Sequence, residues 1–236
     1  MQNLKYISKP TLDLNLIIVS LLCFTLISCE SNNNDNTAAA GALALVANNS
    51  STSSSSTTPS CTTTGTCKIF IANPTAPINA GISGFDTHCN NSTNKPSGSY
   101  TYKALVSDGI KRRACSTANC SGGTSEHIDW VLKPNQQYKT NDGTTIIGTT
   151  NANGLFPVPL TNSIQPTAID GSSDLVITGL NDNWTAGDDC NDWTGTGNGK
   201  YGAHIEVGIK AFSEATMACS DLINNTYKGK AICVEQ

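Results

Sequence analysis

Apolar residues in this chain occur in short clusters separated by Gly, Asn, Asp and Pro. The clearest alternation of apolar with polar positions is at Ile128, Trp130 and Leu132, which predicts a strand with one buried face. Further short clusters predict strands at residues 67–72, 102–107, 144–148, 175–178, 204–209 and 231–235. Strands are therefore expected to make up most of the regular structure.

Helical spacing is confined to two segments. Residues 79–90 place Ile82, Phe85 and Cys89 three and four positions apart, so this segment predicts a helix. Residues 213–222 predict a second, shorter helix. Few helices, many short strands and long loops together indicate an α+β domain.

The N-terminal part of the chain has the layout of a signal peptide. Lys5 and Lys9 precede an apolar run at residues 14–27, which is too short to span a membrane comfortably as a permanent helix. The run ends in Leu-Ile-Ser-Cys at residues 26–29, which resembles a bacterial lipobox. The alternative is an ordinary secretory signal with an incidental cysteine.

From this resemblance we expect residues 1–28 to be removed as a signal peptide. Cys29 then carries acyl chains that anchor the protein to the outer membrane or cell surface. Residues 29–66 are dominated by Asn, Ser, Thr and Ala, which bury too little apolar surface to offset their ordering entropy, and predict a disordered tether. Residues 67–236 are of ordinary size for one domain.

Net charge argues against a nucleic-acid partner. The chain carries 14 Lys and Arg against 18 Asp and Glu, giving a formal charge of −4. The basic run Lys111, Arg112 and Arg113 is either a solvated loop or part of an anionic-ligand patch.

Cysteine number predicts disulfides. Of ten cysteines, Cys23 leaves with the signal peptide and Cys29 takes the lipid. The remaining eight are Cys61, Cys67, Cys89, Cys115, Cys120, Cys190, Cys219 and Cys233. An even number in an exported chain favours disulfides over free thiols, and number alone leaves the pairing open. Cys61 is close enough to Cys67 in sequence for a local bridge, and the same holds for Cys115 and Cys120.

No metal or other cofactor is expected. There is no CxxC motif, and His88, His127 and His204 lie in unrelated segments, which disfavours zinc. The oxygen-rich residues 188–192 leave a calcium site open as an alternative to ordinary turn formers.

No enzyme is predicted, because the chain lacks HExxH, GxSxG, SxxK and P-loop motifs. The best acid or base candidates, Glu126, His127 and Asp129, fall on a predicted strand, where His127 and Asp129 share one face and Glu126 points away. We expect this to be a solvated strand face. Trp184 precedes and Trp193 lies within residues 186–201, a Gly-, Asn- and Asp-rich segment expected to be a loop. Each indole is either a lid on the core or an anchor for a partner.

Several segments, taken in order, resemble a spirochaetal lipoprotein family. They include GxxGxDxxC at residues 81–89, CxxWT at 190–194 and the terminal CVEQ at 233–236. On these motifs the chain resembles the leptospiral endostatin-like lipoproteins and the wider domain family of unknown function to which they belong. The resemblance implies a C-type-lectin-like, endostatin-like fold. It also implies disulfides from Cys89 to Cys233 and from Cys190 to Cys219.

The resemblance further implies an adhesin-type binding module outside the cell. Family members are associated with host extracellular-matrix proteins such as laminin and fibronectin, and with complement regulators of the factor H type. Candidate ligand-binding residues are Trp184, Trp193, Lys111, Arg112 and Arg113. The alternatives are a structural envelope lipoprotein without a host ligand, and a carbohydrate-binding lectin-like protein.

Overall fold

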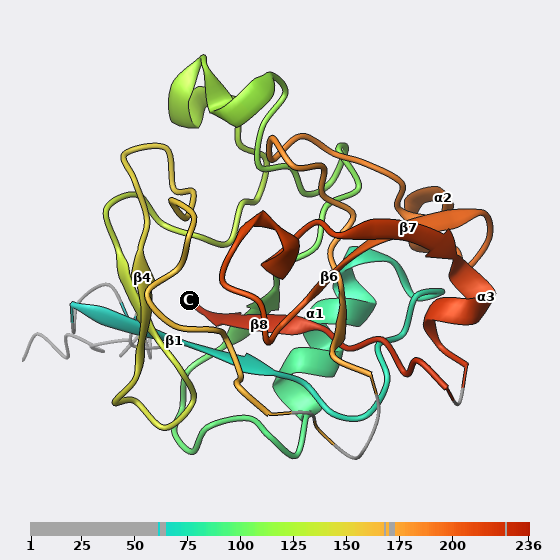
Figure 1. Ribbon diagram of the computed structural model, residues 1–236, viewed down its shortest axis with the longest axis horizontal. Coiled ribbons are helices and arrows are strands. Elements are labelled where there is room, and N and C mark those ends of the chain that lie inside the picture. The colour runs from blue at the N-terminus through green and yellow to red at the C-terminus, as the bar shows by residue number, and fades with distance from the viewer. Residues whose placement is uncertain (1–60, 62–64, 168, 170–172, 225) are drawn as a thin grey trace, which may run out of the picture. The chain divides into compact units, whose positions relative to one another are not determined.

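The structure is a computed structural model that describes residues 61, 65–167, 169, 173–224 and 226–236 (Figure 1). All of them belong to one compact unit, Ser54–Gln236. The predicted signal peptide, Cys29 and nearly all of the predicted tether lie outside the described residues. Within the described part of the chain, no helix is long and apolar enough to cross a membrane.

The strands form two sheets. One sheet has five strands in the order β2-β8-β1-β3-β4, and the other has three in the order β5-β6-β7. The strands are β1 (Thr66–Ile71), β2 (Tyr102–Ala104), β3 (Gln137–Lys139), β4 (Ile146–Thr149), β5 (Leu175–Ile177), β6 (Asn198–Ala203), β7 (Ala215–Ala218) and β8 (Ile232–Glu235). The helices are α1 (Gly81–Asn91), α2 (Cys190–Trp193) and α3 (Cys219–Leu222), with short 3-10 turns η2 (Ala118–Cys120), η3 (Gly123–Glu126) and η4 (Ile209–Ala211).

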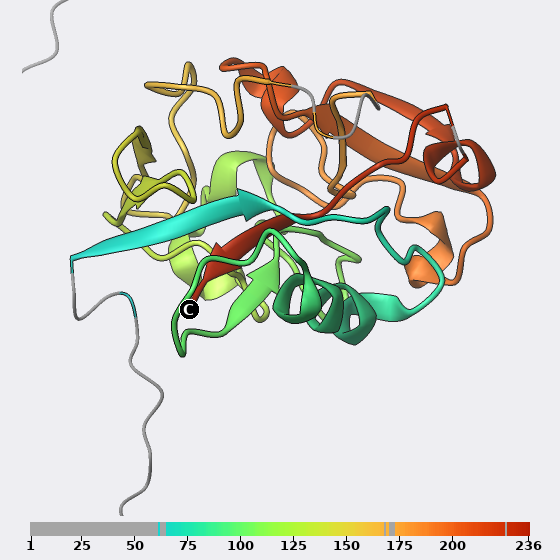
Figure 2. The same cartoon turned by 90° about the horizontal axis from the view of Figure 1, so that it is seen from below.

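The C-terminal strand β8 joins the start of the domain to its end. It pairs antiparallel with β1 and with β2, placing Cys233 opposite Phe70 on one side and Ala104 on the other. All four β8 residues are buried, as expected for an interior strand that is covered on both faces. Figure 2 shows β1 and β8 side by side, with α1 close to β2.

Helix α1 lies where its apolar spacing predicts. Ile82, Phe85 and Cys89 are buried on one face of the helix. Phe85 contacts the Trp193 ring edge-on, with 5.0 Å between ring centroids. The predicted helix is therefore confirmed, and this face forms part of the core.

The predicted α+β class is confirmed, and so are most of the predicted strands. β1, β2, β4, β5 and β8 lie at the apolar clusters that predict them. The predicted strand at Ile128, Trp130 and Leu132 is wrong, because Ile128 makes only a single bridge to Arg113. Trp130, Val131 and Leu132 are all buried, so this segment crosses the core instead of presenting alternate faces.

Two further predicted elements are corrected. The strand at residues 204–209 is wrong, because β6 ends at Ala203 and Ile205 and Val207 are exposed. The helix at residues 213–222 begins only at Cys219, and β7 occupies its first half. In both cases pairing of the Gly-containing strand β6 with β5 and β7 decides the structure, not local apolar spacing.

Four disulfides pair all eight cysteines of the domain, as the sequence predicts. The bridges are Cys61–Cys67, Cys89–Cys233, Cys115–Cys120 and Cys190–Cys219. The long-range pairing is the one that the family resemblance implies. Cys61 falls within the predicted tether, yet it is buried, and its N–H donates to the Gln236 carbonyl at 3.3 Å.

Residues 186–201, expected to be a loop, contain a left-handed helical turn. The φ angles of Cys190, Asn191, Asp192 and Trp193 are 58°, 56°, 55° and 57°. A left-handed turn costs about 1–2 kcal/mol per residue, so tertiary contacts must hold it. Those contacts are the Cys190–Cys219 bridge and the fully buried indole of Trp193.

Candidate binding surface

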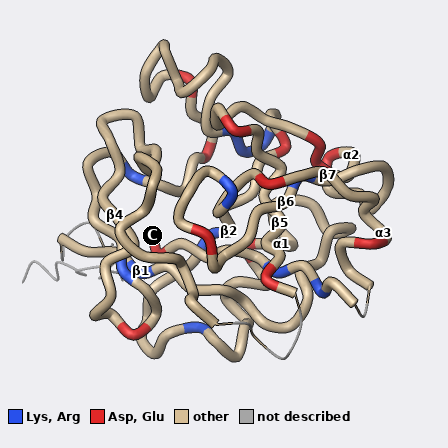
Figure 3. Tube along the Cα trace, in the orientation of Figure 1, with Lys and Arg blue, Asp and Glu red and all other residues tan. Residues whose placement is uncertain are grey.

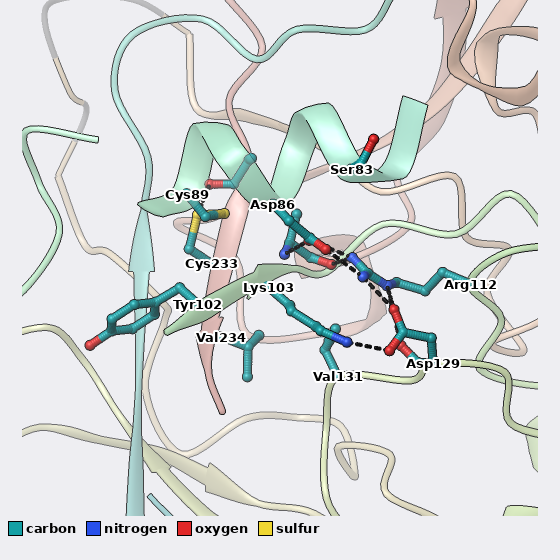
Figure 4. A network of polar contacts seen from close by, with 12 residues as sticks. Ser83, Asp86, Cys89, Tyr102, Lys103, Arg112, Asp129, Val131, Cys233 and Val234 are labelled. Atoms are coloured by element: carbon teal, nitrogen blue, oxygen red, sulfur yellow. Dashed lines mark hydrogen bonds and ion pairs between the residues drawn. A yellow bond between two sulfur atoms is a disulfide. The ribbon is translucent and has the colours of Figure 1, made fainter. Parts of the chain in front are cut away.

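A buried guanidinium is the centre of an extensive polar cluster in the domain. The Arg112 side chain donates from Nη1 and Nη2 to the two carboxylate oxygens of Asp86, at 2.7 and 2.8 Å. Its Nη2 also donates to Asp129 at 2.6 Å, and its Nη1 to the Ala104 carbonyl at 2.9 Å (Figure 4). With Nε donating to Asp129 as well, every nitrogen of the fork has an acceptor.

The same cluster covers the free edge of strand β2. Asp86 Oδ1 accepts from the Ala104 N–H at 2.9 Å. One turn further along α1, the Asn90 side chain accepts from Tyr102 N–H at 3.0 Å and donates to the Tyr102 carbonyl at 2.8 Å. Side chains four residues apart on α1 thus satisfy an edge that would otherwise be open to another strand.

Charges within the cluster nearly cancel. Lys103 forms an ion pair with Asp129, so two cations face two carboxylates. Burial by itself lowers the pKa of Arg112, but the hydrogen bonds to Asp86 and Asp129 outweigh it and leave that pKa above its usual value. Burial by itself raises the pKa of Asp129, but the hydrogen bonds from Lys103 and Arg112 have the larger effect. The pKa of Asp129 is therefore below its usual value. The cluster is a structural clamp and not a site awaiting an anion.

The clamp supports a rigid turn that presents two side chains to solvent. Asp108 Oδ1 accepts from the N–H groups of Ile110, Lys111 and Arg112, at 3.0, 2.7 and 2.9 Å. The Arg112 carbonyl in turn accepts from the N–H groups of Asp108 and Gly109. Ile110 is 66% exposed at the tip of this turn, and Lys111 beside it is exposed too.

A hollow of about 330 Å³ opens beside this turn. Lys111, Arg112, Asp86 and Asp129 line one part of it. The first turn of α1 lines the rest, with Ala80, Gly81, Ile82 and Ser83. We name the exposed tip, Ile110 and Lys111, together with this hollow the turn surface.

The basic run is divided by the fold. Lys111 alone of the three is exposed, whereas Arg112 is fully buried and Arg113 is half-buried. Arg113 Nε donates to the Glu126 carbonyl at 3.0 Å. Figure 3 shows Lys and Arg interspersed with Asp and Glu along the described trace. Arg112 therefore belongs neither to a solvated loop nor to an exposed anion patch.

Both candidate tryptophans are in the core. Trp193 is fully buried against Phe85, and Trp184 is 4% exposed, 4.9 Å from Phe212 between ring centroids. The structure thus corresponds to the core alternative that the sequence left open. The Cys190–Cys219 bridge lies in the same turn as Trp193 and fixes that turn against the domain. Trp184 packs in an aromatic cluster with Phe212.

The acid and base candidates do not share a strand face, because no strand forms at residues 126–129. Glu126 ends the 3-10 turn η3, and its carboxylate accepts from the N–H groups of Ser116, Thr117 and Gly122. A hydrogen bond from the Thr117 hydroxyl, together with these N–H groups, lowers the pKa of Glu126 to about 2. Such a carboxylate stays ionised and is a poor general acid near neutral pH.

The carboxylates near α2 point to separate partners. Asp189 accepts from the Asp192 N–H at 3.1 Å, and Asp188 from the Thr216 hydroxyl at 3.2 Å. In the part of the chain that the structure describes, no three His, Cys, Asp or Glu side chains gather as a metal site would require. Asp189 thus caps α2, whereas Asp188 contacts strand β7.

Sequence reasoning missed the carboxylates that organise the turn surface. Asp86 and Asn90 lie at i and i+4 on α1, a spacing that places both on one helix face. That spacing is a usable signal, but the hydrogen-bond partners of these two side chains come from β2 and Arg112, which lie elsewhere in the sequence. Asp108 gives a local signal as well, since Asp followed by Gly is typical of a turn.

The comparison with protein families identifies the domain. A family model described as a protein of unknown function, DUF1554, matches residues 72–207. The chain belongs to the DUF1554 family. The matched range includes Asp86, Arg112 and Asp129 of the clamp, while β8 and Cys233 lie beyond it. Among curated proteins, a sequence search finds no match.

Proposed function

We propose that this DUF1554 protein is an exported lipoprotein, anchored through Cys29, whose domain binds host extracellular-matrix or complement-regulatory proteins. In this proposal it acts as the leptospiral endostatin-like lipoproteins do, which its sequence motifs resemble. The anchor rests on the lipobox-like residues 26–29. The observation that carries the binding role is the exposed Ile110 on a turn whose backbone is fixed by Asp108 and Arg112.

Rigidity matters for this role. Binding residues are commonly displayed on loops that a stable scaffold positions, and a preformed loop loses little entropy when it binds. Ile110 offers apolar area that a partner can bury. The adjacent Lys111 can steer an acidic partner towards the turn surface. The four disulfides keep the scaffold rigid outside the cytoplasm.

Surface plasmon resonance tests the proposal with the mature chain carrying Cys29→Ser, which stays soluble, against laminin, fibronectin and factor H. Ile110→Ser should weaken binding about tenfold, mainly by faster dissociation, as expected for a buried apolar contact. Lys111→Ala should slow association and reduce its dependence on salt. Ile223→Ser is the matched control, because Ile223 is 41% exposed and does not belong to the turn surface.

Three outcomes would contradict parts of this proposal. Binding to none of the three proteins at micromolar concentrations, by a folded chain, would favour the structural-envelope alternative. If the Ile110→Ser and Ile223→Ser variants bind equally strongly, the contact does not lie on the turn surface. Acyl-chain labelling of living cells that persists after Cys29→Ser would remove the anchor.

A further inference from the structure

A second pocket, which shares no lining residue with the turn surface, is mostly apolar. Its volume is about 310 Å³, at the lower end of the range for ligand sites. The apolar lining consists of Leu155, Phe156, Pro157, Val158, Trp184 and Ile209. The floor is the edge of an aromatic cluster, in which Phe212 stacks on Phe156 at 5.8 Å between ring centroids.

The indole N–H of Trp184 has no hydrogen-bond acceptor among the described residues. The Trp184 side chain is 4% exposed and lines this pocket. Its nitrogen is not one of the fully enclosed unpaired polar atoms, which belong to His88, Asp174, Trp193 and His204. The N–H is therefore accessible, and it belongs to a side chain that lines this pocket, so it can donate to a bound group.

Three polar residues complete the lining, and each keeps a group unused. Asn151 Oδ1 accepts from the N–H groups of Asn153 and Leu155, which leaves its amide NH₂ free to donate. Asp182 Oδ1 accepts from Ser213 at 2.6 Å, leaving Oδ2. The Asn119 side chain makes no hydrogen bond within the described part of the chain, although its backbone does.

We propose that this pocket binds one uncharged aromatic ring with a single polar group at its edge, of the phenol type. The apolar walls take the ring, and Trp184 Nε1–H with the Asn151 amide takes the polar edge. The Asp182 carboxylate and the absence of a cation from the lining disfavour an anion. A sugar is disfavoured because most of its hydroxyls would face apolar walls without partners.

This inference does not depend on the proposed function, since the two sites share no lining residue. A free phenol and the Tyr side chain of a partner share the required chemistry. The experiment uses one probe for each source: p-cresol for the small molecule and N-acetyl-tyrosinamide for a side chain attached to backbone. Methyl glucoside is the sugar probe.

Ligand-observed NMR with the mature Cys29→Ser chain measures binding of each probe. p-Cresol should bind at millimolar concentrations, and Trp184→Phe should weaken it about two- to tenfold, the factor for one hydrogen bond. Val158→Asp places a charge at the mouth, where Val158 is 43% exposed, and should weaken binding at least as much. Ile223→Asp is the matched surface control and should leave binding unchanged.

Thermal unfolding of each variant confirms that it folds, and Val158→Asp keeps the test decisive if Trp184→Phe does not fold. Binding of both phenolic probes supports a partner side chain as the source, and binding of p-cresol alone supports a small molecule. No p-cresol binding, binding that Val158→Asp leaves unchanged, or tighter binding of methyl glucoside would each overturn the proposal.

Discussion

The Arg112 guanidinium and the Asp86 carboxylate meet as two parallel hydrogen bonds, 2.7 and 2.8 Å long, between a turn and helix α1. This geometry is the planar fork that only arginine offers to a carboxylate. It ties α1, the edge of β2 and the Asp108 turn into one rigid unit. The stability of the domain and the display of Ile110 therefore depend on the same pair.

Replacing Arg112 should destabilise the domain strongly. Arg112→Met leaves Asp86 and the Ala104 carbonyl without their donor, and we expect a loss of about 3 kcal/mol in the free energy of unfolding. Arg112→Lys should also destabilise, because an ammonium cannot make the two parallel bonds. Urea unfolding measures both. Lys111→Met, one residue away but exposed, is the control and should change the free energy of unfolding by less than about 0.5 kcal/mol. A loss for Lys111→Met as large as that for Arg112→Met would contradict the stabilising role of the Arg112 cluster.

Two of the four disulfides close loops of very different length and should therefore differ in how much they stabilise the domain. Cys89–Cys233 closes a loop with a sequence separation of 144, and Cys115–Cys120 one of 5. On the chain-entropy model these bridges contribute about 5 and about 2 kcal/mol. Double Cys→Ser variants compared by denaturant unfolding test the order. A larger loss for the short loop would show that strain or local packing outweighs loop entropy.

Glu126 should make stability depend on acid pH. Its pKa in the folded protein is lowered from 4.5 to about 2, so its contribution is fully present above about pH 4.5 and is lost as pH falls towards about 2. Glu126→Gln cannot take up that proton. Its free energy of unfolding should be lower at neutral pH and should fall less steeply between those pH values. Equal slopes for both proteins would mean that the N–H groups around Glu126 do not favour its ionised form.

The left-handed turn should tolerate glycine but not a branched side chain. Asn191 has φ 56° and is exposed, so its replacement changes backbone preference and removes one long, exposed hydrogen bond to Thr194. Asn191→Val should cost about 1–2 kcal/mol in thermal or urea unfolding, because β-branching is least compatible with this conformation. Asn191→Gly should lie within about 1 kcal/mol of the native chain. A harmless valine would show that the turn is right-handed or free to change.

Local patterns in the sequence determined the elements whose cause is local. The spacing of Ile82, Phe85 and Cys89 predicts α1, and the apolar cluster at residues 67–72 predicts β1, because each buries a continuous face. The even cysteine number predicts a disulfide-paired domain, since that depends on compartment and count. The α+β class follows from the same patterns.

Only the tertiary structure decided the rest, because it depends on which distant segments meet. Residues 128–132 alternate like a strand, but Trp130, Val131 and Leu132 are all buried in the core. Lys111, Arg112 and Arg113 read as one basic run, yet Asp86 on α1 and Asp129 draw only Arg112 inward. A guanidinium is buried only where carboxylates from other elements pair with it. The spacing of residues along the chain does not predict which carboxylates will lie beside it.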